Sequence, residues 1–536
     1  MPDPGARGQY DALIIGAGHN GLVCAWQLAR AGWRVCVLEA HTVPGGAAVT
    51  EEFHPGYRNS VASYTVGLLA PEVIEEMQLA RHGLEIRLRP AANFVPALDG
   101  PGLLLHGEAS ATCEEIARHS PADAARYPRY LAQLGEIADA LATLARRAPP
   151  DPAGGLRDLL GMLRDGRRLR RLGREAMAML GELLGGSAGH LLDRWFDSDL
   201  LKAALGFDAV VGANQSPYTP GSGYVLLHHV FGETLGQRGA WGHAVGGMGA
   251  ITSAMAAACR AEGVELRCGL AVEEVLVADG RCQGVRLADG ERVFARRVAA
   301  AVNPRLLCTR LLAPEHLPAA FLERMRHWRC DSASLRINLA LERPPTLAAR
   351  PAPGPHYGAG IILAPSLRHM DAAWLESRTA GWSRSPVVEL LLPSMIDDTL
   401  APPGRHVASL FCQFFPYDLP GDRHWDEARD AAVDDVLAWV ERFLPGLRAS
   451  VVGRQVLSPL DLERRFGLTR GDIFHGAMGL DQLWSLRPAL GAAAYRLPVE
   501  GLTLCGAGAH PGGGVTGLPG RNAARAMLAE GFRRRH

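Results

Sequence analysis

Residues 10–39 read YDALIIGAGHNGLVCAWQLARAGWRVCVLE, and this stretch decides the fold. The apolar run 12–15 predicts a strand buried on both faces. Residues 22–31 contain helix formers without proline and predict a helix, which Gly32 ends. Residues 33–38 predict a second strand. The order of strand, glycine turn, helix and strand is typical of the first unit of a Rossmann-like domain.

The turn between these elements, Gly16-Ala17-Gly18-His19-Asn20-Gly21, is a complete Gly-x-Gly-x-x-Gly motif. Gly16 allows the tight turn, Gly18 lets a pyrophosphate approach the backbone, and Gly21 lets the helix pack closely on the sheet. Glu39 lies 23 residues after Gly16, where a carboxylate accepts hydrogen bonds from a ribose diol. The motif therefore predicts a dinucleotide site, and the alternative is a glycine-rich turn in an ordinary α/β protein.

The bulk composition excludes several classes of protein. Lys+Arg and Asp+Glu balance at 56 each, so no overall field favours nucleic acid. The ten cysteines include no Cys-x-x-Cys, so we predict neither a dithiol redox motif nor a metal site. We find no secretory signal and no apolar run near the roughly 20 residues that span a membrane. We therefore expect a cytoplasmic protein with reduced thiols.

Residues 156–184 form a basic segment in which six arginines fall within eleven residues, from Arg164 to Arg174. Leucines recur there at helical intervals. A basic amphipathic helix of this kind can lie on an anionic membrane surface. The alternative is a solvated helix whose arginines pair with acids elsewhere, so peripheral membrane contact through 156–184 remains an open expectation.

The last stretch mirrors the first. Residues 502–505 predict a strand, 506–520 form a long glycine loop, and 521–532 predict a helix. The paired Gly45 and Gly46, after the first nucleotide-binding strand, can also present bare backbone to a cofactor, or form a plain turn. Two such elements at opposite ends of the chain suggest one cofactor held across a discontinuous domain.

Further elements are expected between these two ends. Residues 195–236 hold apolar and turn residues that suit either a substrate cavity or ordinary core. The remaining predictions are a helical region at 111–148 broken at Pro121 and Pro128, a helix at 250–262, short strands within 264–302, a largely antiparallel sheet over 333–460, and a helix at 425–443.

These motifs together resemble the phytoene-desaturase-like flavoproteins, and within them the branch of pyridine-nucleotide-disulfide-oxidoreductase-domain proteins. The resemblance rests on GAGHNGL with Glu39, GGAA at 45–48, GGMGA at 246–250 and CGAGAHPGGGVTGLPGRNAARA at 505–526. It implies an α/β fold in which a Rossmann-like FAD-binding domain is interleaved with a mixed-sheet and helical substrate domain, the architecture of glutathione reductase and the amine oxidases. The implied FAD-binding domain comprises 1–70, 240–305 and 495–536, and the substrate domain 71–239 and 306–494.

The resemblance also implies the cofactor contacts. FAD would meet Gly16, Ala17, Gly18, Asn20, Gly21, Glu39, Ala40, Gly45, Gly46, Val272, Gly508, Gly513, Gly514 and Val515. Many related flavoproteins have Asp where this chain has Ala507, so one contact is missing or made by backbone. Despite the branch name, the absence of Cys-x-x-Cys argues against disulfide reduction.

The expected activity is an FAD-dependent oxidoreductase of the desaturase or dehydrogenase type. An apolar isoprenoid or polyene-like substrate would pass hydride to flavin N5, or undergo double-bond isomerisation, with oxygen or a quinone as electron acceptor. Two alternatives stay open: an amine oxidase, for which Tyr495 and Trp484 are the nearby aromatic candidates, and a non-catalytic FAD-stabilised interaction protein.

The catalytic base is not evident from the sequence. His510 is the candidate, because the resemblance places it beside the flavin and imidazole titrates near neutrality. The alternative is that its side chain only orders the glycine loop. Arg487 would either hold a substrate carboxylate or flavin oxygen, or form a surface salt bridge.

Overall fold

The computed structural model describes residues 10–533, and its first elements are those expected from the glycine motif. Strand β1 (Tyr10–Ile15) leads through the turn into helix α1 (His19–Arg30) and strand β2 (Val35–Glu39). β1 pairs in parallel with β2, and the core side chains of both strands are buried. The helix begins three residues earlier than predicted, because Gly18 is already its N-cap.

One seven-stranded sheet gathers strands from distant parts of the chain. Its order is β11-β2-β1-β14-β13-β12, with β20 paired to β14. β1 lies parallel to β14, and β14 lies parallel to β20, while β12 to β14 form an antiparallel extension. The strands that join β1 and β2 are β11 (Glu265–Cys268), β12 (Val272–Ala278), β13 (Arg281–Leu287), β14 (Arg292–Ala300) and β20 (Leu502–Leu504).

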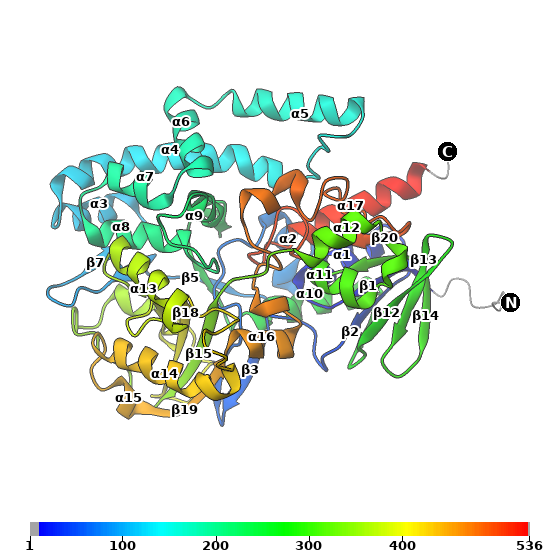
Figure 1. Cartoon of the computed structure of the whole chain (residues 1–536). Coiled ribbons are helices and arrows are strands. Elements are labelled where there is room, and N and C mark those ends of the chain that lie inside the picture. Colours follow the sequence, from blue (N-terminus) through cyan, green and yellow to red (C-terminus); the bar gives the residue numbers. More distant parts are fainter. Residues whose placement is uncertain (1–9, 534–536) are drawn as a thin grey trace.

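Helices from both ends of the chain cover this sheet. α1 packs against α17 (Leu518–Arg533) and α10 (Gly249–Ala261), so the first and last segments fold together (Figure 1). Every strand of the sheet comes from the three segments expected to bind FAD, although the exact domain boundaries stay a prediction.

A second seven-stranded sheet has the order β19-β15-β18-β17-β16-β6-β7. It is antiparallel except where β6 runs parallel to β16, so it is mixed as expected. Its strands are β6 (Asn93–Val95), β7 (Leu103–Leu105), β15 (Ser334–Leu341), β16 (Gly360–Leu363), β17 (Val388–Leu391), β18 (His406–Gln413) and β19 (Val451–Leu457).

Helices α3 to α9 lie together on one side of the second sheet (Figure 1). They are α3 (Ala109–Ala117), α4 (Pro121–Ala145), α5 (Leu156–Leu169), α6 (Arg174–Gly185), α7 (Ala188–Trp195), α8 (Asp199–Gly206) and α9 (Ser222–Val230). Within residues 10–533 no helix combines the length and the apolar character needed to cross a bilayer.

Two local predictions in this region were wrong. Pro128 does not break α4, which continues through it, because buried Tyr127 and Tyr130 on either side pack into one hydrophobic core and outweigh the lost hydrogen bond. The break predicted at Pro121 is confirmed, because α3 ends at Ala117 and Pro121 begins α4, at a position where its missing N–H costs nothing. The basic segment is two helices, α5 and α6, with Gly173 as the N-cap of the second.

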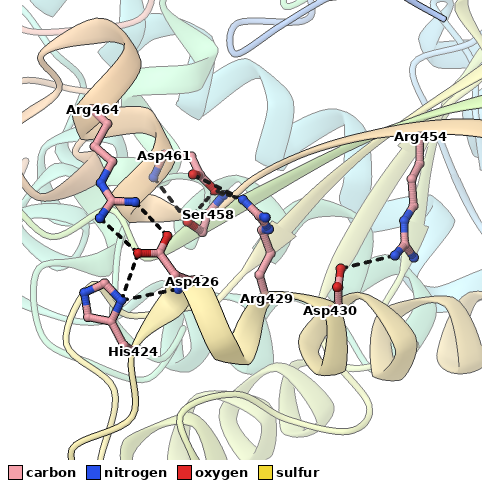
Figure 2. Close-up of polar contacts among 8 residues, drawn as sticks. All are labelled: His424, Asp426, Arg429, Asp430, Arg454, Ser458, Asp461 and Arg464. Atoms are coloured by element: carbon pink, nitrogen blue, oxygen red, sulfur yellow. Dashed lines mark hydrogen bonds and ion pairs between the residues drawn. The ribbon is translucent and has the colours of Figure 1, made fainter.

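A polar network fixes α16 (Pro459–Phe466) against α14 (Trp425–Glu441) (Figure 2). Arg464 donates two hydrogen bonds to the carboxylate of Asp426, at 2.6 and 3.0 Å. At the start of α16 the Ser458 hydroxyl accepts from the Asp461 N–H, while the Asp461 carboxylate accepts from the Ser458 N–H. This capping box and the Arg464 pair set the position of a helix that reaches the cavity described next.

Candidate functional site: a cavity between the two sheets

A cavity of about 1020 Å³ is lined both by the glycine turn of the first sheet and by residues of the second. Pockets for small ligands reach roughly 1,000 Å³, so this space suits a large ligand or two ligands together. Its first side, which we call the glycine wall, consists of Gly16, Gly18, Asn20, Glu39, Gly45 and Gly46.

Bare backbone shapes the glycine wall. A Cβ on Gly18 would meet no atom within 4 Å, so it would project into the open cavity. Gly18 and Gly45 form a backbone bridge that joins the two glycine loops, and the Gly45 N–H donates to the Ala17 carbonyl. Gly21 faces away from the cavity, where a Cβ would lie 2.1 Å from the Gly16 carbonyl oxygen. The two roles assigned to these glycines, close approach at Gly18 and close packing at Gly21, match the geometry.

Glu39 is held rigidly at the end of β2. Its Oε2 accepts from the Ala17 N–H at 2.7 Å, and its Oε1 accepts from the His41 N–H at 2.9 Å. Each carboxylate oxygen can accept a further hydrogen bond, so the group can still receive a ribose diol. Ala40 and Val272 line the same part of the cavity, whereas Ala17 contributes its N–H to Glu39 and does not face the cavity.

The C-terminal glycine loop reaches the cavity only in part. Gly514 and Val515 line it, as expected. Gly508 and Gly513 do not: a Cβ on Gly508 would lie 2.2 Å from Pro304, and one on Gly513 would lie 2.5 Å from Phe474. These two glycines are therefore required for close packing of the loop, because neighbouring chain occupies the space beside them.

His510 lies where the loop turns away from the cavity. Its side chain is buried, its Nε2 lies 3.2 Å from the Leu144 carbonyl oxygen, and it is not among the cavity-lining residues. Burial lowers the pKa of His510 to about 4, so the imidazole is neutral. Its partner is a helix-end carbonyl of α4 outside the cavity lining, so the expected place of this side chain beside a flavin stays a prediction that this contact does not support.

Arg487 takes neither of the roles expected for it. It is fully buried and donates to the carbonyl oxygens of Phe474 and Ala507, both at 2.8 Å, and to that of Gln482 at 3.1 Å. The guanidinium ties the 474–482 segment to the C-terminal glycine loop. Its contacts are structural, because it reaches neither the cavity nor the surface.

The side of the cavity formed mainly by the second sheet, which we call the second-sheet wall, consists of Tyr64, Asn93, Asp208, Glu389 and Phe411. The Tyr64 hydroxyl donates a short hydrogen bond to Oε2 of Glu389, whose Oε1 lies 3.5 Å from a guanidinium nitrogen of Arg89. Burial, aided by the nearby charge of Glu389, raises the pKa of Asp208 to about 8. At neutral pH Asp208 is therefore a protonated carboxyl on this wall, beside the phenol of Tyr64, the amide of Asn93 and the side chain of Glu389.

Aromatic side chains complete the lining, but they are not the two expected from the sequence. Tyr495 is fully buried and donates to the His510 carbonyl oxygen at 3.0 Å, and Trp484 packs edge-on against Tyr224. Neither lines the cavity. The aromatic residues that do are Tyr64, Phe207, Trp241, Phe411, Phe466 and Phe474. The segment 195–236 contributes to both cavity and core, since Phe207 and Val211 line the cavity while Phe196 lies in a hydrophobic core.

Comparison with known proteins identifies the family. The family model described as flavin containing amine oxidoreductase matches residues 21–528. This chain belongs to that family. The match covers the second sheet, the first sheet apart from β1, and most of the cavity lining. It makes the protein a flavin-dependent oxidoreductase by family membership, with FAD as the implied cofactor.

Individual relatives agree with this assignment. Pyridine nucleotide-disulfide oxidoreductase domain-containing protein 2 from Rattus norvegicus is 42% identical over 97% of this chain and 94% of its own length. Phytoene desaturase (lycopene-forming) from Pseudescherichia vulneris is 29% identical over 96% of this chain and 98% of its own. Cyclohexylamine oxidase from Brevibacterium oxydans has a TM-score of 0.55 at 15% identity, covering 98% of this chain and 100% of that one, which is a likeness of fold.

The residues of this family member fit a bound FAD. The first turn of α1 lacks a side-chain cap, so its N–H groups are available to a phosphate. Three buried polar atoms on the cavity lining have no hydrogen-bond partner among residues 10–533: Nε2 of His19, Oδ1 of Asn20 and Nδ1 of His475. Buried polar groups are ordinarily satisfied, so these atoms are consistent with a polar ligand in the cavity.

The second-sheet wall is the part of this oxidoreductase that sequence reasoning missed. Tyr64, Asp208 and Glu389 come from three separate segments and belong to no short motif. The one available signal was Glu389 itself, an acid inside the apolar run VVELLLP. A charged residue in a buried strand is rare unless it is paired, and this one is paired with Arg89.

Proposed function

We propose that this protein desaturates an apolar isoprenoid or polyene-like substrate, or isomerises its double bonds, with oxygen or a quinone as electron acceptor in the oxidative case. One observation carries the proposal: a single cavity joins the glycine wall to a space lined by Phe207, Val211, Trp241 and Phe474. An apolar substrate and the cofactor can therefore share one water-poor compartment. The substrate named for phytoene desaturase, a similar protein, supports the same class.

FAD, when bound, supplies the hydride-accepting N5 atom. Apolar side chains around the cavity hold the substrate and exclude water. Forming an alkene from a saturated carbon pair removes a hydride, which the bound cofactor would take, and a proton, which needs an acceptor on the protein. Glu389 is the carboxylate placed to accept that proton, and the Tyr64 hydroxyl donates to the same group.

A second candidate, amine oxidation, has its own observation. Carboxyl groups of Glu389 and Asp208 lie with the rings of Tyr64 and Phe411 on one wall, and carboxylates and aromatic faces both attract an ammonium group. Against it, the Arg89 guanidinium beside Glu389 offsets the negative charge, and Asp208 is protonated at neutral pH.

The test is to mix the purified holoprotein with a substrate in the absence of oxygen. Reduction of the flavin is measured as a loss of its absorbance. Phytoene in detergent micelles should bleach the flavin, and cyclohexylamine should not. Bleaching by the amine with release of peroxide on aeration would favour the second candidate. If flavin is retained but neither substrate class reduces it, and phytoene is also not isomerised, the proposed function is wrong.

A further inference from the structure

Helix α5 turns its apolar face toward solvent, whereas an ordinary surface helix turns that face toward the core. Within it no residue is buried, and four leucines are exposed: Leu156 by 71%, Leu159 by 48%, Leu160 by 57% and Leu163 by 52%. Their spacing of three and four residues places them on one face. A surface helix normally turns such a stripe toward the core, so this face lacks the contact that its sequence would favour.

The inward side of α5 carries both acidic residues of the helix together with the half-buried Met162 and Leu169. Oδ1 of Asp158 accepts from the Asp151 N–H at 3.0 Å, and Asp165 forms an ion pair with Arg147. Gly161 lies against Pro150. The helix stands beyond α4 at the edge of the molecule (Figure 1). Polar contacts and the packing of Leu169 against a hydrophobic core therefore fix its orientation, and both acidic residues of the helix are used on the protein side.

Positive charge flanks the leucine stripe. Among the residues that the structure describes, no ion pair involves Arg157, Arg164, Arg167, Arg168, Arg170, Arg171 or Arg174. This crowding of positive charge affects a neighbouring residue. Burial, and after it the charges of Arg164 and Arg168, lower the pKa of Arg147. The exposed surface of α5 and of the residues just after it thus combines apolar side chains with arginines that have no ion pair within the described part of the chain.

We propose that α5 docks on an anionic phospholipid bilayer, with the four leucines inserted at the headgroup boundary and the arginines contacting lipid phosphates. A helix with a strongly charged face and an apolar face is suited to lie in the plane of a membrane surface. Each arginine near an anionic surface adds electrostatic attraction. A second copy of this chain is a poorer occupant, because a twofold pairing of this face would bring two arginine clusters together.

The experiment is co-sedimentation of the full-length holoprotein with phosphatidylcholine vesicles, with and without phosphatidylglycerol. We expect binding to the anionic vesicles only, weakened by high salt. The variant L159Q/L160Q/L163Q should bind at least about tenfold more weakly, since each loses apolar surface that would enter the bilayer. Its flavin content and melting temperature should match those of the parent, because these side chains are exposed.

The matched control is L375Q/L490Q, which changes leucines that are 53% and 52% exposed elsewhere on the surface. It should bind vesicles as the parent does. Absence of binding by the parent, or an equal loss in the control, would overturn the proposal. A dimer in light scattering that dissociates in the triple variant, without vesicle binding, would assign the stripe to a second copy and overturn it as well. The result does not depend on the proposed chemistry, because vesicle binding is measured without turnover.

Discussion

The glycine wall of the cavity is assembled mostly from main chain, whereas the second-sheet wall is assembled from side chains. Gly16, Gly18 and Gly45 contribute bare backbone, because they have no side chain. The carboxylate of Glu39 completes this wall. Tyr64, Glu389 and Asp208 instead contribute functional groups from segments far apart in sequence. The contrast suggests that cofactor binding and substrate chemistry can be disrupted separately.

The largest effect should follow from filling the glycine wall. Gly18→Val places a side chain in the open space where a pyrophosphate would approach, so we expect bound flavin to fall by at least about tenfold. Flavin absorbance per purified protein measures this. Gly181→Val is the matched control, because a Cβ there also meets nothing within 4 Å, on α6 and outside the cavity lining. Full flavin content in Gly18→Val would show that the glycine wall does not hold the pyrophosphate.

Changes in the second-sheet wall should leave flavin bound and slow its reduction. Glu389→Gln keeps the shape and one acceptor but removes the base, so substrate-dependent bleaching should slow by about a hundredfold. Tyr64→Phe should slow it less, because the carboxylate remains. Stopped-flow absorbance gives the rates. Loss of flavin in Glu389→Gln, rather than slower reduction, would mean that the two walls are not separable.

The third effect is a pH dependence of stability that originates at Asp208. Its pKa in the folded protein is about 8, against 3.8 for an ordinary aspartate, so the folded state holds a proton that the unfolded state releases. Stability therefore falls as pH rises from about 4 to about 8. Asp208→Asn removes this dependence. The free energy of unfolding of the variant, relative to that of the parent, should therefore increase by on the order of 1 kcal/mol or more between pH 5 and pH 8.

Denaturant unfolding of Asp208→Asn and the parent at both pH values measures this change. Asp426→Asn, a substitution at an exposed position, serves as the comparison. Its free energy of unfolding, relative to that of the parent, should not increase between the two pH values. An Asn variant that follows the parent at both pH values would mean that Asp208 is ionised in the folded protein.

The smallest effect is expected at the network in Figure 2. Asp426 and Arg464 are both about half exposed, and exposed ion pairs contribute little to stability. Asp426→Asn should shift the melting temperature by no more than about one degree and leave flavin content unchanged. Differential scanning fluorimetry and the flavin spectrum provide both readouts. A large loss of flavin would show that α16 is positioned chiefly by this pair and not by its capping box.

Much of the fold was predictable because local chemistry specified it. The strand, turn and helix around Gly16 need particular residues at fixed spacing, and the short strands expected within 264–302 include β12, β13 and β14. Pro128 shows where local rules fail, since tertiary packing on both sides carried the helix through it. The basic segment was likewise predicted as one helix although it folds as two, because helical periodicity alone does not reveal a short interruption.

The candidate site divides in the same way. Glu39 was predictable because it follows the glycine motif at a characteristic distance. The role of His510 was not predictable in this way, because a residue's position within a loop does not determine where its side chain points, and here it points to the carbonyl of Leu144. Gly508 and Gly513 belong to the expected loop, and the structure adds that neighbouring chain lies where a Cβ on either residue would project.

The sequence by itself determined a Rossmann-like unit, an acid for a ribose, a second glycine loop at the far end and a basic leucine-bearing segment. Each depends on residues close together in the chain, whose backbone conformations are set by local sterics and capping. Only the tertiary structure decided that Tyr64, Asp208 and Glu389 share a wall, and that the leucines of α5 face outward. Those outcomes depend on which distant segments pack together, and no short stretch of sequence contains that information.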